Sequence, residues 1–150
     1  LRFAIDSLDP QSEDLLALLG NFRWRFDRRL RSAGIELIWE VEEVPKLEHY
    51  TSREIFELLR ILQEALGNVL KHAQARRIRL SIRWKPDTQD ILIALEDDGC
   101  GFDQEKNHTG RGLSHMRMRA KSIPAELRFT VGLDGMGTGV HLTVHKTRSK

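Results

Sequence analysis

The chain has 150 residues, 40% hydrophobic and 31% charged, a composition typical of one globular domain that excludes a disordered chain. Its formal charge of +2 is too small to indicate nucleic acid, so we expect no direct nucleic acid partner. One cysteine, Cys100, excludes an internal disulfide, and no apolar run approaches the roughly 20 residues of a membrane helix.

The N-terminal segment predicts helices. Residues 1–8 carry apolar side chains at helical spacing before Pro10, and residues 13–19 fit a short helix that ends near Gly20. An amphipathic helix is expected over 21–33, because apolar residues recur there at every fourth position, namely Phe22, Phe26 and Leu30.

A strand and the longest helix follow. Residues 35–41 alternate apolar and acidic side chains, which predicts a half-buried strand. Thr51 and Glu54 resemble a capping box that opens a helix over 52–73. The apolar stripe of this helix contains Ile55, Leu58, Leu59, Leu62, Leu66, Val69 and Leu70.

The C-terminal half predicts four strands and one helix. Strands at 78–84 and 91–96 are linked by a turn at 85–89, and the second is more continuously apolar and therefore more central. A helix over 112–122 precedes strands at 127–131 and 140–144. Five strands with about three helices on one face indicate an α+β fold, a two-layer α/β sandwich with a mixed, mostly antiparallel sheet.

Three polar residues of the long helix could carry chemistry. Glu64, Asn68 and Lys71 stand at i, i+4 and i+7, so they form one stripe. Asn is unfavourable inside a helix, whereas its amide oxygen is a good ligand for a hard cation. A carboxylate one turn earlier could orient a water or accept a proton, and a lysine one turn later could meet phosphate. An ordinary solvent-exposed face is the alternative interpretation.

The stretch from Asp97 to Phe102 is the most informative of the chain. Asp97 follows an apolar strand, and Gly99 and Gly101 leave room for a ligand to approach the backbone. A partly buried carboxylate needs a hydrogen-bond donor, which the exocyclic amine of adenine provides. An acidic turn with incidental glycines is the alternative.

Two further glycine clusters follow. Gly110 and Gly112 open a predicted helix, whose free N–H groups could bind an anion. The cluster at 135–139 precedes the last strand, where Thr138 could bond Asp97 or a purine. Each cluster alone is also compatible with a simple loop.

Together these stretches resemble the motifs of bacterial sensor histidine kinases. Residues 62–73 look like the N box, 97–102 like the first glycine box, 110–113 like the second, and Gly137 and Thr138 like the third. The chain is thus similar to the gyrase, chaperone, histidine-kinase and mismatch-repair ATPases, and most similar to the nitrate-sensor subgroup. The resemblance covers about residues 20–146 and implies a Bergerat-type ATP-binding fold.

The resemblance implies specific roles. Asn68 would hold Mg²⁺ between the phosphates of ATP, and Glu64 would act on the attacking group and reach the metal through a water. Lys71 and His72 would lie near phosphate, and Asp97 would bind the adenine amine. The remaining implied ATP-binding residues are Gly99, Gly101, Gly110, Gly112, Leu113, Gly137 and Thr138.

The resemblance also implies partners. Such enzymes pass the γ-phosphoryl group of ATP to a histidine on a separate helical domain, and from there to a response regulator. Residues 1–20 resemble the end of a dimerisation helix and its linker, and 21–150 the catalytic domain. No histidine of the chain is followed by an acidic residue, as an acceptor would be, so we expect Mg-ATP binding without self-phosphorylation. We expect a cytoplasmic domain of a membrane-anchored homodimeric parent.

Other interpretations remain open. An ATPase of the same superfamily with another task, such as a serine kinase that regulates a sigma factor, would share these motifs. A non-catalytic nucleotide-binding module would share the glycines alone. Arginines gather at 23–31 and again at Arg76, Arg77, Arg79 and Arg83; solvated faces are the simpler interpretation, and a docking surface for an acidic partner is the alternative.

Overall fold

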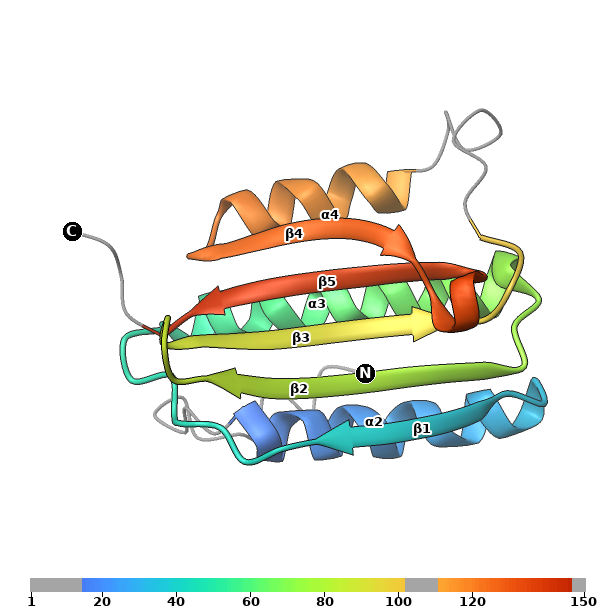
Figure 1. The fold of residues 1–150 in the computed structure, drawn as a ribbon, viewed down its shortest axis with the longest axis horizontal. Helices are drawn as coiled ribbons and strands as arrows, with labels where there is room; N and C mark the ends of the chain where they lie inside the picture. Colours follow the sequence, from blue (N-terminus) through green and yellow to red (C-terminus); the bar gives the residue numbers. More distant parts are fainter. Residues whose placement is uncertain (1–14, 102–110, 147–150) are drawn as a thin grey trace.

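The computed structural model describes residues 15–101 and 111–146 (Figure 1). Within these residues the elements follow in the order α2 (Leu15–Ser32), β1 (Glu36–Val41), α3 (Ser52–Asn68), the π-helical turn η1 (Val69–Ala73), β2 (Arg77–Lys85), β3 (Asp90–Asp97), α4 (Arg111–Lys121), β4 (Ala125–Val131), the short 3₁₀ turn η2 (Leu133–Gly135) and β5 (Thr138–His145).

The five strands form one mixed sheet in the order β1-β2-β3-β5-β4. Within the described sheet, β1 and β2 run parallel and are connected through the helix α3, whereas the other neighbours are antiparallel. The central position of β3 agrees with its continuous apolar sequence. The predicted mostly antiparallel, five-stranded sheet is therefore confirmed.

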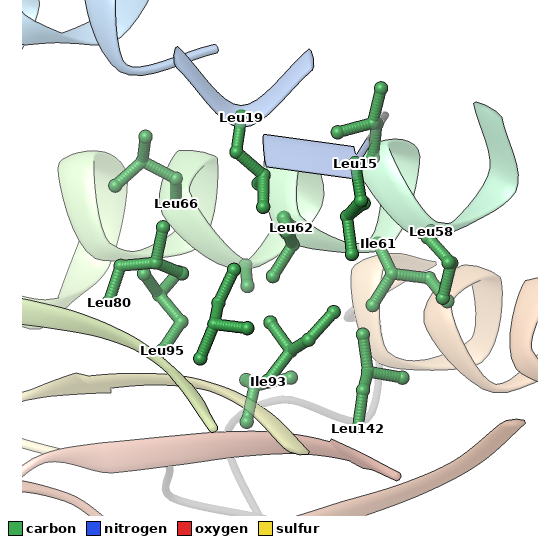
Figure 2. Packing of buried hydrophobic residues seen from close by; sticks show 14 of the residues in the cluster. Leu15, Leu19, Leu58, Ile61, Leu62, Leu66, Leu80, Ile93, Leu95 and Leu142 are labelled. Carbon is green, nitrogen blue, oxygen red and sulfur yellow. The ribbon is translucent and has the colours of Figure 1, made fainter. Parts of the chain in front are cut away.

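Helices cover one face of this sheet, and the hydrophobic core lies between the two layers. Figure 2 shows Leu58, Ile61 and Leu62 of α3 above Ile93 of β3 and Leu142 of β5. Each of these side chains is almost completely buried. Burial of large aliphatic side chains from both layers is the main stabilising contribution to such a sandwich.

The N-terminal helix differs from the prediction. Gly20 does not end a helix, since α2 continues from Leu15 to Ser32 through it. Leu19 and Phe26 lie on the same buried face on either side of Gly20, whose own position is exposed. Burial of this face outweighs the modest cost of one glycine in a helix interior. The segment 1–14 lies outside the described residues, so the predicted boundary at residue 20 stays a prediction.

The long helix begins as predicted but ends differently. The side-chain oxygen of Thr51 accepts a hydrogen bond from the backbone N–H of Glu54 at 3.1 Å, which confirms the expected N-terminal cap. The α-helix ends at Asn68, and the rest of the predicted span, Val69–Ala73, is a π-helical turn. Among the described residues, no helix combines the length and the apolarity needed to cross a membrane.

Candidate functional site

The predicted site elements gather at one end of the sheet. The C-terminal ends of α3 and β3, the start of β5 and the turn η2 all lie at this end in Figure 1. Asn68 is the last residue of α3, and Asp97 is the last residue of β3. The sheet register supports this arrangement, because Glu96 pairs with Gly139 at the beginning of β5.

Asp97 is the most buried acidic residue near this end, with 2% of its surface exposed. Its carboxylate oxygen Oδ1 accepts a hydrogen bond from the backbone N–H of Gly99 at 2.8 Å, and the carboxylate also accepts one from the backbone N–H of Thr138. Thr138 is itself buried. The two turns predicted to form the site therefore meet at one carboxylate.

Close approach explains why glycines surround this carboxylate. A side chain on Gly137 would overlap the backbone oxygen and the carboxylate of Asp97. Gly137 also has a φ of +67°, and Gly101 a φ of +76°. A side-chain carbon on Gly101 would lie 3.1 Å from the backbone oxygen of Gly137. The first and third predicted glycine boxes are thus packed against each other.

Burial and hydrogen bonding act in opposite directions on Asp97. Burial raises the pKa of its carboxyl group, and this effect exceeds the lowering by the backbone N–H groups of Gly99 and Thr138. A buried carboxylate with few donors is a strong acceptor for a further donor from a ligand. This property fits the predicted contact with an exocyclic amine.

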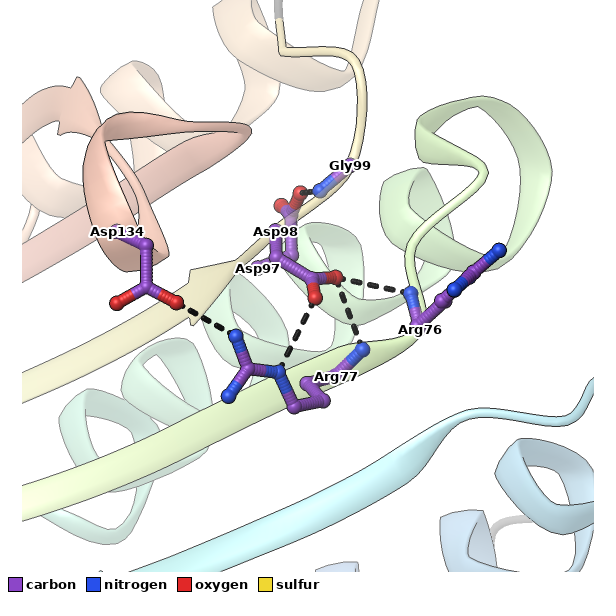
Figure 3. Close-up of polar contacts among 6 residues, drawn as sticks. All are labelled: Arg76, Arg77, Asp97, Asp98, Gly99 and Asp134. Carbon is purple, nitrogen blue, oxygen red and sulfur yellow. Dashed lines mark hydrogen bonds and ion pairs between the residues drawn. The ribbon is translucent and has the colours of Figure 1, made fainter.

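Asp98, the next residue, belongs to an ion-pair network that the sequence did not predict (Figure 3). Its Oδ1 accepts the backbone N–H groups of Arg76 at 2.8 Å and Arg77 at 2.9 Å, and its Oδ2 lies 3.2 Å from Nε of Arg77. Nη2 of Arg77 lies 2.6 Å from Oδ2 of Asp134 in η2. Alternation placed Arg77 on the polar face of a strand, but no sequence signal named its partners.

The polar stripe of α3 lies at the same end. Glu64 and Asn68 are half-buried, and Lys71 is exposed in the π-helical turn. In the described part of the chain, no three His, Cys, Asp or Glu side chains cluster as a metal cage would require. One amide and one carboxylate instead fit Mg²⁺, which usually keeps several waters and takes its other ligands from substrate phosphates. A π-helical turn is frequent at functional sites.

The remaining predicted residues are less constrained. Gly110 lies outside the described residues. The surroundings of Gly112 and of the His72 side chain are likewise not described. Gly112 belongs to α4, whose first turn therefore contains part of the predicted second glycine box. Leu113 is half-buried and packs against the hydrophobic core. Its predicted contact with ATP stays a prediction.

Comparison with known proteins gives consistent results. The family described as "Histidine kinase-, DNA gyrase B-, and HSP90-like ATPase" matches residues 54–148. The signal transduction histidine-protein kinase/phosphatase UhpB of Salmonella typhimurium is 32% identical over 130 residues, which cover 85% of this chain and 25% of that protein. The chain spans a quarter or less of the length of the first curated relatives that it matches.

Solved structures show the same fold. The histidine kinase domain of a blue-light activated histidine kinase from Erythrobacter litoralis has a TM-score of 0.72 at 20% identity, over 95% of this chain and 67% of that one. Full-length ShkA, solved in complex with AMPPNP, has a TM-score of 0.67 at 20% identity, over 92% of this chain and 31% of that one.

Proposed function

The chain belongs to the family of histidine kinase-, DNA gyrase B- and HSP90-like ATPases, and on that premise we propose that it is the ATP-binding catalytic domain of a sensor histidine kinase. The observation that carries this proposal is the buried carboxylate of Asp97. It packs closely against Gly137 and accepts hydrogen bonds from the backbone N–H groups of Gly99 and Thr138. A carboxylate in such a place selects a ligand that brings its own N–H donor, as the 6-amino group of adenine does.

The polar residues of α3 and η1 act on the phosphates in this proposal. Mg²⁺, when bound with ATP, supplies positive charge to the phosphate oxygens. Asn68 would contribute an amide oxygen toward the metal, and Lys71 would contribute a positive charge toward phosphate. Most of the catalytic effect in such a site comes from positioning and charge neutralisation.

The transfer involves one phosphoryl group and one proton. A histidine nitrogen of a separate helical domain forms a bond to the γ-phosphorus, the bond from this phosphorus to the bridging oxygen of ADP breaks, and ADP leaves with the electron pair. The histidine ring loses its N–H proton, which Glu64 accepts directly or through a water. Because none of the six histidines precedes an acidic residue, the chain itself does not become phosphorylated.

The same proposal extends to the parent protein. Its partners are the phosphoacceptor and dimerisation domain, which the chain phosphorylates, and a response regulator, which receives the phosphoryl group next. The parent is a membrane-anchored homodimer with this domain in the cytoplasm. The names of two curated relatives, a signal transduction histidine-protein kinase/phosphatase and a sensor histidine kinase, support a role of the parent in signal transduction.

Calorimetry with Mg-ATP tests the binding site. Asp97→Asn places an amide opposite the adenine amine and should weaken binding by roughly ten- to a hundredfold, because a hydrogen bond to a charged group is lost.

Asn68→Ala should weaken binding only when Mg²⁺ is present. The matched controls are Asp87→Asn in the exposed turn between β2 and β3, and Gln63→Ala on the exposed face of α3. Unchanged affinity in Asp97→Asn would contradict the proposal.

Phosphoryl transfer tests the activity. The chain is mixed with γ-labelled ATP and with the acceptor-helix domain encoded by the same parent gene. Label should appear on the acceptor domain and be absent from the chain alone, and Glu64→Gln should slow the transfer more than it weakens ATP binding. Label on the isolated chain, or an acceptor that stays unlabelled while ATP binds, would refute the assigned reaction.

A further inference from the structure

Arg77 lies beside the candidate site but has no role in the proposed phosphoryl transfer. It is the first residue of β2, and its side chain is 43% exposed. Nε lies 3.2 Å from Oδ2 of Asp98, and Nη2 lies 2.6 Å from Oδ2 of Asp134. One planar guanidinium therefore bridges two carboxylates that are 36 positions apart in the sequence.

The two bridged carboxylates belong to the two segments that enclose Asp97. Asp98 directly follows Asp97 and precedes Gly99, whose N–H bonds the Asp97 carboxylate. Asp134 lies in the segment 132–138, in which Gly132 and Gly137 both pack closely against Asp97. Figure 3 shows Arg77 between the end of β3 and the turn η2. A shift of either segment would move the groups that hold the Asp97 carboxylate.

The turn η2 contains a residue in the left-handed conformation. Asp134 has a φ of 55°, which is uncommon for a residue with a side chain. Such conformations persist when surrounding contacts fix them. Among the described residues, the ion pair with Arg77 joins this turn to β2. Asp98 is fixed independently by the backbone N–H groups of Arg76 and Arg77.

We propose that Arg77 is a positioning residue for adenine recognition, which holds the turn after Asp97 and the segment 132–138 at the separation that places the Asp97 carboxylate against the adenine amine. This inference rests on the proposed function, because it concerns the same site. Exposed ion pairs contribute little to stability, and Asp134 is 73% exposed. Arg77 is therefore expected to affect the relative position of the turn after Asp97 and the segment 132–138 more than the stability of the fold.

Two variants separate the ion pair from other effects. Asp134→Asn removes the charge while keeping a residue that readily adopts the left-handed conformation. Arg77→Gln removes the guanidinium. The matched control is Arg79→Gln, because Arg79 lies on the same face of β2 and pairs with Glu96 of β3 at 3.0 Å, but has no contact with η2 among those described.

The measurement compares Mg-ATP with Mg-ITP, in which a carbonyl oxygen replaces the 6-amino group. Calorimetry of both nucleotides gives the affinity ratio for the wild-type chain and each variant. We expect Arg77→Gln and Asp134→Asn to weaken ATP binding by about three- to tenfold with little change in ITP binding. The double variant should lose no more than Arg77→Gln alone, and Arg79→Gln should keep the wild-type ratio.

The outcomes distinguish this inference from the proposed function. A wild-type chain that binds ATP in preference to ITP, with the same preference in Arg77→Gln, would overturn the inference alone. An equal loss for both nucleotides would show a general loosening of the fold and would also overturn it. A wild-type chain that binds neither nucleotide would overturn the proposed function, and the inference with it.

Discussion

Asp97 and Asp98 are consecutive residues whose carboxyl groups lie in opposite electrostatic environments. Burial raises the pKa of Asp97 above its ordinary value. Burial also acts to raise the pKa of Asp98, but the backbone N–H groups of Arg77 and Arg76 and the Arg77 guanidinium outweigh it, so the net shift is downward. Neighbouring acids of the same type should therefore titrate at clearly different pH values.

This difference predicts opposite pH dependences of stability. The raised folded-state pKa of Asp97 gives a contribution to stability that is complete below the unfolded value of about 3.9 and is lost as the pH rises through the folded pKa. The lowered pKa of Asp98 gives a contribution that is complete above about 3.9 and is lost as the pH falls through the folded pKa.

Urea unfolding between about pH 3 and pH 7 measures both effects. The free energy of unfolding of the wild type minus that of Asp97→Asn should decrease with rising pH. The corresponding difference for Asp98→Asn should increase. Two differences with the same sign of slope would contradict the environments described for these carboxyl groups.

At the level of single elements, α2 shows that burial of an apolar helix face outweighs the tendency of a glycine to end a helix. Gly20 is exposed in the interior of this helix, and a side chain added there would meet no atom within 4 Å. Gly20→Ala should therefore raise the free energy of unfolding by about 0.5–1 kcal/mol, since alanine favours the helix. Gly34→Ala provides the contrast, because its φ of +72° should make the same change unfavourable by about 1 kcal/mol.

Thermal and urea unfolding of the two variants measure this pair of effects. A destabilised Gly20→Ala would mean that the helix is broken at residue 20, as the sequence had suggested. A neutral Gly34→Ala would mean that the chain after α2 does not adopt the left-handed conformation.

Local sequence patterns were sufficient to predict most elements. The five strands follow from alternation, and the turn between β2 and β3 and the cap at Thr51 follow from their residue types. Two features had no local signal. The helix past Gly20 depends on packing of Leu19 and Phe26 against other elements. The change to a π-helical turn after Asn68 depends on backbone hydrogen bonding, which residue type does not determine.

The site was predictable in part for a related reason. Glycines mark places where the backbone must approach closely, and Gly137 against Asp97 is such a place. Ion pairs of the kind that join Arg77 to Asp134 leave no spacing pattern, because the partners are 57 positions apart and meet only through the sheet. Alternation predicts the face on which a charge lies, and not the partner that it meets.

At the scale of the whole molecule, the candidate site and the hydrogen bonds of Tyr50 lie at opposite ends of the sheet. Asp97 and Thr138 mark one end, whereas Asp90 pairs with His145 at the other, about 24 Å away along β3. At that far end the hydroxyl oxygen of buried Tyr50 lies 2.6 Å from the backbone oxygen of Pro124 and 2.8 Å from that of His145. Its single proton is donated to one of these oxygens at a time.

Tyr50→Phe should therefore lower the stability of the fold without changing the affinity for Mg-ATP. Loss of the hydroxyl leaves two partly buried carbonyl oxygens with one donor fewer and should lower the free energy of unfolding by about 0.5–1.5 kcal/mol. Because the site end keeps all of its contacts, the affinity for Mg-ATP should stay within about twofold of the wild type in calorimetry at a temperature where both proteins are folded. A parallel fall in affinity would mean that the sheet transmits changes along its length, and the two ends could then no longer be treated as independent.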